Sequence, residues 1–202
     1  MIKAVIFDVG GVLLRTEDRR YRRHWEEKLG LPDWAADEIV FNSESGIQAQ
    51  TGLITEEDHW QWVGEHLGLL PTDLAQFRRD FWAGDRLDGA LVAYIGRLRT
   101  RYQTAIISNA MDGLRHVLTE TYPIVDRFDL VVISAEEKVM KPDATIYERT
   151  LARLGRQPAE AVFIDDFQHN ITAARGVGMP AVHFTPDTDL SAELEKLGVA
   201  IY

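Results

Sequence analysis

An aspartate follows a short apolar run near the N-terminus. Residues 5–7 are Val, Ile and Phe, Asp8 comes next, and Gly10 and Gly11 lie just beyond it. An apolar run that ends at a glycine-rich turn is typical of a central parallel strand, whose carboxyl end is where open α/β sheets expose their ligands. A carboxylate there can attack phosphorus to form an acyl-phosphate, or carbon to form an ester. Taken alone, Asp8 fits a turn or helix cap equally well.

A hydroxyl and an amide follow a second run of this kind. Residues 104–107 read Thr-Ala-Ile-Ile, and Ser108 and Asn109 come directly after them. Taken alone, the pair is more typical of a helix N-cap than of a binding site. At a strand end, the same groups can donate hydrogen bonds to an anion.

Two adjacent aspartates follow a third apolar run. Asp165 and Asp166 come after residues 161–164. One aspartate would suffice for a helix cap, and two adjacent like charges are costly unless a cation lies near them. Together with Asp8, the pair forms the kind of oxygen-rich site that Mg²⁺ prefers.

A lysine completes this set of polar groups. Lys141 precedes Pro142 in the connection that follows residues 130–133. A solvated surface lysine is the usual interpretation of one such residue. A nucleophile, donors for phosphate oxygens, paired carboxylates and a cation are nevertheless the groups that phosphoryl transfer needs.

The composition limits the class of protein and of partner. With 202 residues and 46% hydrophobic content, the chain fits one large domain or a domain with a modest insertion. The formal net charge of −10 argues against nucleic acid and anionic membranes as partners. The absence of cysteine excludes disulfides and thiolate sites. With neither a signal-like start nor a long apolar run, the chain is expected to be cytoplasmic.

The elements that must position these groups fall into two patterns. Residues 15–86 are rich in charge and tryptophan and predict helices, with Asp33, Thr55 and Thr72 as candidate N-caps and Asp58 completing a capping box with Thr55. The expected helices in this stretch are residues 18–29, 33–42, 55–67 and 72–82.

Beyond residue 87, apolar strands alternate with helices, which predicts an α/β fold with a doubly wound parallel sheet and right-handed crossovers. We assign residues 1–14 and 87–202 to this core and residues 15–86 to an inserted helical cap domain. The expected strands are residues 104–107, 130–133, 161–164 and 181–184, the expected helices are residues 89–102, 111–121, 144–154 and 170–176, and residues 185–202 should hold a turn, a helix and an edge strand.

Four arginines open the expected cap. Arg19, Arg20, Arg22 and Arg23 are interleaved with acidic residues, which predicts a solvated, salt-bridged helix face. The alternative is that one arginine turns inward to bind an anionic substrate.

The ordered motifs resemble the haloacid dehalogenase-like hydrolase superfamily. Together they span residues 8–179 in the family's order. The resemblance implies a Rossmann-like core with a helical-bundle cap inserted after the first motif, where the helix-rich stretch falls. The motifs are Phe7-Asp8-Val9-Gly10-Gly11-Val12-Leu13, Ile107-Ser108-Asn109, Lys141-Pro142-Asp143 with Ile146-Tyr147, and Phe163-Ile164-Asp165-Asp166 with Asn170, Ala173, Ala174, Gly176, Gly178 and Met179.

The resemblance also implies roles for matching residues. Asp8 would be nucleophile and metal ligand, Ser108 a phosphate donor, and Lys141 the charge that steadies the nucleophile and the phosphoryl group. Asp165 and Asp166 match the metal-binding acidic motif, with Asp166 expected as the closer ligand.

Two positions are less standard. Asn109 is expected to orient either the substrate or the loop. Family phosphatases commonly carry a second Asp two residues after the nucleophile, where this chain has Gly10. The glycine carbonyl could still bind a metal, but side-chain acid/base catalysis, typically worth about 10² to 10⁴-fold, would be lost.

Two other hypotheses stay open. L-2-haloacid dehalogenases also lack that second Asp and need no metal, because halide leaves without protonation. A nearly inactive member could instead bind a phosphorylated ligand or a protein partner. Retention of the Asp165 and Asp166 pair favours a phosphatase over a dehalogenase.

We therefore predict a Mg²⁺-dependent hydrolase of small phosphomonoesters, such as a sugar phosphate, which acts through an aspartyl-phosphate and is slow because of Gly10. Its partner would be a small phosphorylated metabolite, and the protein would be a monomer or homodimer. The expected site residues are Asp8, Gly10, Asp165 and Asp166 for the metal, Ser108, Asn109 and Lys141 for the substrate, and Asp8, Ser108 and Lys141 for catalysis.

Overall fold

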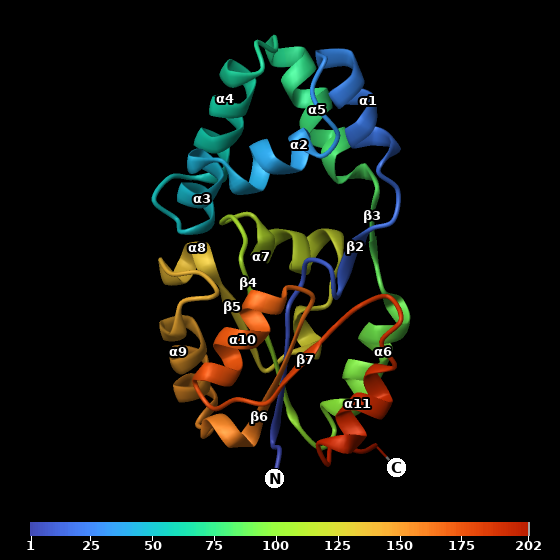
Figure 1. Cartoon of the computed structure of the whole chain (residues 1–202), viewed down its shortest axis with the longest axis vertical. Coiled ribbons are helices and arrows are strands. Elements are labelled where there is room, and N and C mark those ends of the chain that lie inside the picture. The colour runs from blue at the N-terminus through green and yellow to red at the C-terminus, as the bar shows by residue number, and fades with distance from the viewer. Residues whose placement is uncertain (202) are drawn as a thin grey trace.

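A five-stranded parallel sheet forms the centre of the chain (Figure 1). The computed structural model describes residues 1–201. The strands are β1 (Ala4–Phe7), β4 (Gln103–Ser108), β5 (Leu130–Ile133), β6 (Ala161–Asp165) and β7 (Ala181–His183). They lie in the order β5-β4-β1-β6-β7, and every neighbouring pair is parallel. The chain adds β4 and β5 on one side of β1 and then β6 and β7 on the other. The strand order therefore reverses beside β1, and the carboxyl end of β1 is the switch point at which such sheets bind ligands.

Helices cover both faces of the sheet. Val5 and Phe7 of β1 belong to one apolar cluster and Ile6 belongs to another, as the alternation of side chains along a strand requires. The predicted Rossmann-like, doubly wound α/β fold is confirmed. The first face packs against α6 (Gly89–Leu98) and α11 (Leu190–Lys196), and the second packs against α9 (Ala144–Leu154) and α10 (Gln168–Gly176).

A bundle of helices lies beyond the carboxyl ends of the strands, above the sheet in Figure 1. It is entered through β2 (Leu14–Thr16) and left through β3 (Asp85–Leu87), which pair antiparallel. We call residues 17–84 the helical insertion. The predicted domain boundaries fall within the two-stranded ribbon, and the insertion has its own cluster of buried apolar side chains. Its helices are α1 (Arg20–Leu29), α2 (Ala35–Asp37), η1 (Glu38–Asn42), α3 (Glu44–Gln50), α4 (Glu56–His66) and α5 (Pro71–Ala83).

The predicted capping box at the start of α4 is present. Thr55 Oγ1 accepts a hydrogen bond from Asp58 N, and the Asp58 carboxylate accepts one from Thr55 N, both at 3.1 Å. Two other expected helix starts are wrong. No helix begins at residue 33, since α2 begins after Trp34. Instead of Thr72 acting as N-cap, α5 begins at Pro71, which has no N–H to lose and a φ already suited to the first helical turn.

Several short elements were not predicted or have shifted bounds. The expected helix at residues 111–121 begins only at residue 114, and the helix at residues 89–102 ends at residue 98. Residues 197–201 form no strand, and Tyr202, the last residue of the expected tail, lies outside the described residues. Within residues 1–201, none of the helices combines the length and apolar character needed to cross a bilayer. The remaining helices are α7 (Leu114–His116), η2 (Val117–Thr121), η3 (Val125–Arg127), α8 (Ser134–Glu137) and η4 (Pro158–Glu160).

The arginines at the start of the insertion divide between solvent and interior. Arg20 is exposed and pairs with Asp18 at 2.7 Å, as a solvated face predicts. Arg22 is buried, donates to Asp85 Oδ1 at 3.0 Å and also pairs with Asp37. The prediction of a solvated face is therefore wrong for Arg22, because carboxylates from α2 and β3 converge on it. This inward arginine binds carboxylates of its own chain.

Buried His59 is expected to make stability depend on pH. Its side chain is inaccessible to solvent, and Nδ1 lies 2.9 Å from Ser45 Oγ. Burial lowers the pKa of His59, so the unfolded chain takes up a proton more readily than the folded chain. The contribution of neutral His59 to the free energy of unfolding is therefore complete above the unfolded pKa of about 6.5. It declines as the pH falls below that value, by at most about 1.4 kcal/mol per pH unit.

Urea unfolding at a series of pH values measures this effect. The free energy of unfolding should fall less steeply with acidification in His59→Gln than in the wild type. The matched variant His66→Gln, at an exposed position of the same helix, should follow the wild type. Equal slopes for all three proteins would contradict the prediction.

Candidate active site

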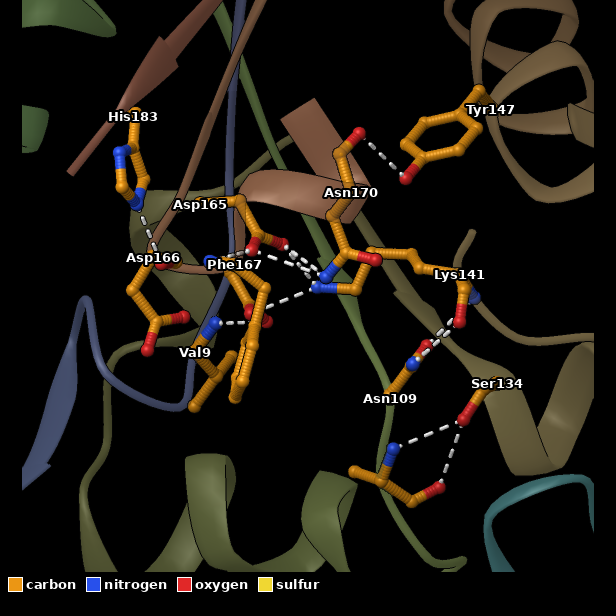
Figure 2. Close-up of polar contacts among 12 residues, drawn as sticks. Val9, Asn109, Ser134, Lys141, Tyr147, Asp165, Asp166, Phe167, Asn170 and His183 are labelled. Atoms are coloured by element: carbon orange, nitrogen blue, oxygen red, sulfur yellow. Dashed lines mark hydrogen bonds and ion pairs between the residues drawn. The ribbon is translucent and has the colours of Figure 1, made fainter. Parts of the chain in front are cut away.

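Three neighbouring strands bring the predicted residues to one edge of the sheet. Asp8 directly follows β1, Ser108 ends β4, and Asp165 ends β6. Because β1 lies between β4 and β6, their carboxyl ends meet. Figure 2 shows Lys141 reaching across to Asp165 from the connection after β5.

Lys141 lies between two carboxylates. Its Nζ is 2.8 Å from Asp8 Oδ2 and 2.7 Å from Asp165 Oδ2, and its side chain is almost wholly buried. Burial alone would lower the pKa of Lys141, but these two carboxylates outweigh it and raise the pKa. The lysine therefore keeps a positive charge at the base of the site, where it can steady a negatively charged group.

The Asp8 carboxylate has a fixed orientation. Its Oδ1 accepts a hydrogen bond from Val9 N at 2.7 Å, while Oδ2 faces Lys141. Burial raises the pKa of Asp8 to about 7; the Lys141 charge opposes this rise and Asp165 adds to it. A carboxylate held in this way is oriented for attack on an electrophile at the mouth of the site.

The two adjacent aspartates have different surroundings. Asp165 is fully buried and accepts hydrogen bonds from Phe167 N at 2.7 Å and from Asn170 Nδ2 at 3.0 and 3.1 Å, in addition to the contact with Lys141 (Figure 2). Its oxygens are thus occupied by the chain itself. Asp166 Oδ1 is buried and has no hydrogen-bond partner among the described residues.

This arrangement fits a divalent cation. Oxygens of Asp8, Asp165 and Asp166 lie within 4.8 Å of one another. Burial, and after it the charge of Asp165, raise the pKa of Asp166 to about 6. One ammonium does not balance three carboxylates, and an unpartnered buried oxygen is costly. A hard cation with oxygen ligands, such as Mg²⁺, would satisfy both requirements.

Gly11 makes room for Asp166. Its φ is +70°, in the left-handed region, and a Cβ atom at this position would lie 2.0 Å from Asp166 Oδ2. A Cβ atom on Gly10, the preceding residue, would meet nothing within 4 Å. A side chain at residue 11 would therefore clash with the Asp166 carboxylate, whereas one at residue 10 would not, so Gly10 serves as the control position for Gly11.

We expect Gly11→Ala to displace Asp166 and weaken metal binding by about 10 to 100-fold, the range typical when a group that orients a ligand is lost. Calorimetric Mg²⁺ titration measures this without any need for turnover. Gly10→Ala should bind Mg²⁺ as the wild type does. Equal affinities for both variants would show that Asp166 is not held against Gly11 for a cation.

Asn109 acts on the loop that carries the lysine. Its Oδ1 accepts from Lys141 N and its Nδ2 donates to Lys141 O, both at 2.8 Å (Figure 2). Of the two roles expected for Asn109, the geometry supports that of orienting the loop. Ser108 is buried at the end of β4, and Gly10 is exposed beside Asp8.

Asn170 and His183 support the site although the sequence motifs predict no role for them. Asn170 fixes the Asp165 carboxylate, and its main-chain oxygen accepts from Tyr147 Oη at 3.2 Å. His183 Nε2 lies 2.8 Å from Asp166 O. The position of Asn170, five residues after Asp165 and inside the last motif, was the available signal for the first of them. His183 carried no such signal, because its contact depends on the pairing of β6 with β7.

Comparison with known proteins gives a consistent result. A family model described as haloacid dehalogenase-like hydrolase matches residues 2–178. A sesquiterpene phosphatase of Aspergillus oryzae is 30% identical over 196 residues, which is 96% of each protein. A D-ribitol-5-phosphate phosphatase of Bacteroides thetaiotaomicron is 25% identical and covers 96% of this chain and 97% of its own length. The chain also matches parts of longer proteins and spans 19% and 39% of two of them.

A solved structure has the same fold. It is that of a HAD family enzyme from Bacteroides thetaiotaomicron in complex with magnesium and inorganic phosphate. The TM-score is 0.81 at 24% identity, with 96% of this chain and 99% of that chain covered. At this identity the likeness shows the fold alone.

Proposed function

The chain belongs to the haloacid dehalogenase-like hydrolases, and from that premise we propose that it hydrolyses small phosphomonoesters with the help of Mg²⁺. Asp8 would attack phosphorus, the P–O bond to the alcohol would break, and water would then cleave the aspartyl-phosphate. Both the attack and the hydrolysis would use groups that lie together at the carboxyl end of β1.

The residues of this chain divide the work. Val9 N and Lys141 hold the Asp8 carboxylate in its orientation. Lys141 and the Ser108 hydroxyl would receive the negatively charged phosphoryl oxygens. Asn109 positions Lys141 through its main chain. The departing alcohol would take its proton from water or from the substrate, because Gly10 has no side chain that could supply one.

Asp8, Asp166 and the Gly10 carbonyl would hold the metal, supported by Asp165. When bound, Mg²⁺ would neutralise phosphate charge and orient the phosphoryl group. Asp165 is already committed to Lys141, Phe167 N and Asn170, so it would act chiefly by placing these partners. Asp166 Oδ1, which has no hydrogen-bond partner among the described residues, would be available to the metal.

The unpartnered, buried Oδ1 of Asp166, in the same cluster as Asp8, is the observation that carries this proposal. A dehalogenase has no use for a cation at this position, because a halide leaves without phosphate charge to be neutralised. The phosphatase names of two relatives that cover nearly the whole chain support the same choice. Those relatives act on quite different alcohols, so the substrate panel should include both terpenyl and sugar phosphates.

The test is an assay of the purified full chain with p-nitrophenyl phosphate, farnesyl phosphate, ribitol 5-phosphate and 2-chloropropionate, each with Mg²⁺ and with EDTA. We expect phosphate release that requires Mg²⁺. Chloride release that persists in EDTA would establish the dehalogenase instead. Mg²⁺ binding with no turnover of any compound would favour the hypothesis of a ligand-binding family member.

A further inference from the structure

One side chain of the sheet domain is buried inside the helical insertion. Met111, three residues after Ser108, is only 6% exposed and belongs to the insertion's apolar cluster. All the other buried members of that cluster lie between residues 25 and 81. The connection after β4 therefore reaches into the insertion, at a place separate in sequence from the β2–β3 ribbon that joins the two parts covalently.

The next two residues hold the start of α4. Asp112 Oδ1 accepts a hydrogen bond from Glu56 N at 3.1 Å, so it supplies an acceptor to an N–H at the first turn of that helix. A Cβ atom on Gly113 would lie 2.1 Å from Glu56 Oε2, so a larger residue would force this carboxylate to shift. Glu56 is itself held by Trp60 Nε1, which donates to its Oε1 at 3.0 Å.

The other end of the same connection is fixed to the active site. Asn109 makes two hydrogen bonds to the main chain of Lys141. Ala110 N donates to Ser134 Oγ at 2.9 Å, and this hydroxyl donates to Ala110 O at 3.2 Å (Figure 2). Only Asn109 and Ala110 separate Ser108 from Met111, and both are held.

We propose that residues 111–113, which we call the plug, couple the docking of the helical insertion to phosphate binding at Ser108. This inference rests on the proposed function, since it is there that Ser108 receives phosphate. Met111, Asp112 and Gly113 are positioning residues. They contact the insertion and act on Ser108, at the end of β4, through the two hydrogen-bonded residues that lie between.

The coupling has a physical basis in linkage. If the insertion tilts away, Met111 must either leave its apolar cluster, which exposes it to water, or pull the connection after it, which would displace Ser108 and Asn109. Docking therefore favours the arrangement that binds phosphate. By reciprocity, bound phosphate must favour docking by the same factor.

The absence of cysteine from the chain allows a direct test. A single thiol is introduced by Met111→Cys, and its reaction with a thiol reagent reports withdrawal of the plug. Leu53→Cys, at a position 73% exposed on the insertion, gives the rate for a free thiol. Val63→Cys, at a fully buried position of the same cluster, gives the rate set by unfolding of the insertion.

We expect the Met111→Cys thiol to react more slowly than that of Leu53→Cys and faster than that of Val63→Cys. Inorganic phosphate with Mg²⁺ should slow it by about fivefold or more, the lower end of usual coupling factors, and leave Leu53→Cys unchanged. A rate equal to that of Leu53→Cys would show that the plug is not docked. A rate equal to that of Val63→Cys, or one that phosphate does not change, would show that docking is not a separate step coupled to the site.

Steady-state kinetics give a second readout. Gly113→Ala should raise KM for p-nitrophenyl phosphate by about 10-fold while changing kcat less, as expected when phosphate binding weakens equally in the ground state and the transition state. Gly89→Ala, where a Cβ atom meets nothing within 4 Å, is the matched control. A Gly113→Ala enzyme with unchanged KM would overturn the inference.

Calorimetry on the wild-type chain separates failure of the plug from failure of the proposed function. If the wild type binds phosphate with Mg²⁺ but the Met111→Cys rate does not respond, the plug is refuted and the proposed function stands. If the wild type neither binds phosphate nor hydrolyses any ester, the proposed function fails, and the coupling inferred from it fails for that reason.

Discussion

Replacing Asp8 with Asn is expected to lower phosphate release by about 10⁴-fold or more, the scale seen when a nucleophile is removed from an enzyme that forms a covalent intermediate. The amide oxygen is a poor nucleophile toward phosphorus. Its NH₂ group cannot accept a hydrogen bond, so one of the two donors that now orient the carboxylate, Val9 N or Lys141 Nζ, would lose its acceptor. The measurement is release of phosphate from p-nitrophenyl phosphate at saturating Mg²⁺.

The fold should tolerate this change. Asp8 is buried, and burial raises its pKa to about 7, so its ionised form costs the folded state free energy. Lys141 keeps Asp165 as a partner at 2.7 Å after the substitution. The thermal midpoint of Asp8→Asn should therefore stay within a few degrees of the wild type, which calorimetry would show.

A matched control removes the same charge elsewhere. Asp187→Asn, at an exposed position near the C-terminus, should retain full activity. Substantial turnover by Asp8→Asn would mean that another group attacks phosphorus and that the assignment of the nucleophile is wrong. Loss of activity in Asp187→Asn would point instead to a general effect of charge.

The sheet could be predicted because its signals are local. Short apolar runs bounded by polar or glycine residues marked β1, β4, β5 and β6, and the ends of three of these runs carry Asp8, Ser108 and Asp165. Parallel strands place such ends at one edge, so topology converts a sequence pattern into a site. The resemblance to a known family added roles to positions that the pattern had already singled out.

Contacts within the site could not be predicted in the same way. The Asn109 side chain meets the Lys141 main chain across 32 residues, and nothing in either segment indicates that pairing. Similarly, Ser108 and Asn109 as isolated residues resemble a helix cap. Only the folded sheet shows that the hydrogen bonds of Asn109 go to a distant loop.

The helical insertion was the least predictable part. Its short helices α2 and α3 lack a long apolar repeat, and a proline displaced the start expected for α5 by one residue. Met111 packs with side chains that lie far from it in the sequence. Propensity and capping rules describe single helices, whereas these features depend on packing between two parts of the chain.

Replacing Gly10 with Asp is expected to speed hydrolysis of alkyl phosphates by about 10²-fold, the lower end of what general acid/base catalysis contributes. The backbone at Gly10 is outside the left-handed region, and a Cβ atom there would meet nothing within 4 Å. A carboxyl group could thus stand at the mouth of the site without displacing a neighbour. It would protonate the departing alkoxide and later take a proton from the attacking water.

The leaving group decides how large this gain is. A p-nitrophenolate ion leaves without a proton, so Gly10→Asp should change the rate for p-nitrophenyl phosphate far less than the rate for ribitol 5-phosphate or farnesyl phosphate. Gly10→Asn, equal in size but unable to donate as an acid, should help neither class. If Gly10→Asp and Gly10→Asn give the same rate on alkyl phosphates, an acid at this position does not supply the proton transfer that limits this enzyme.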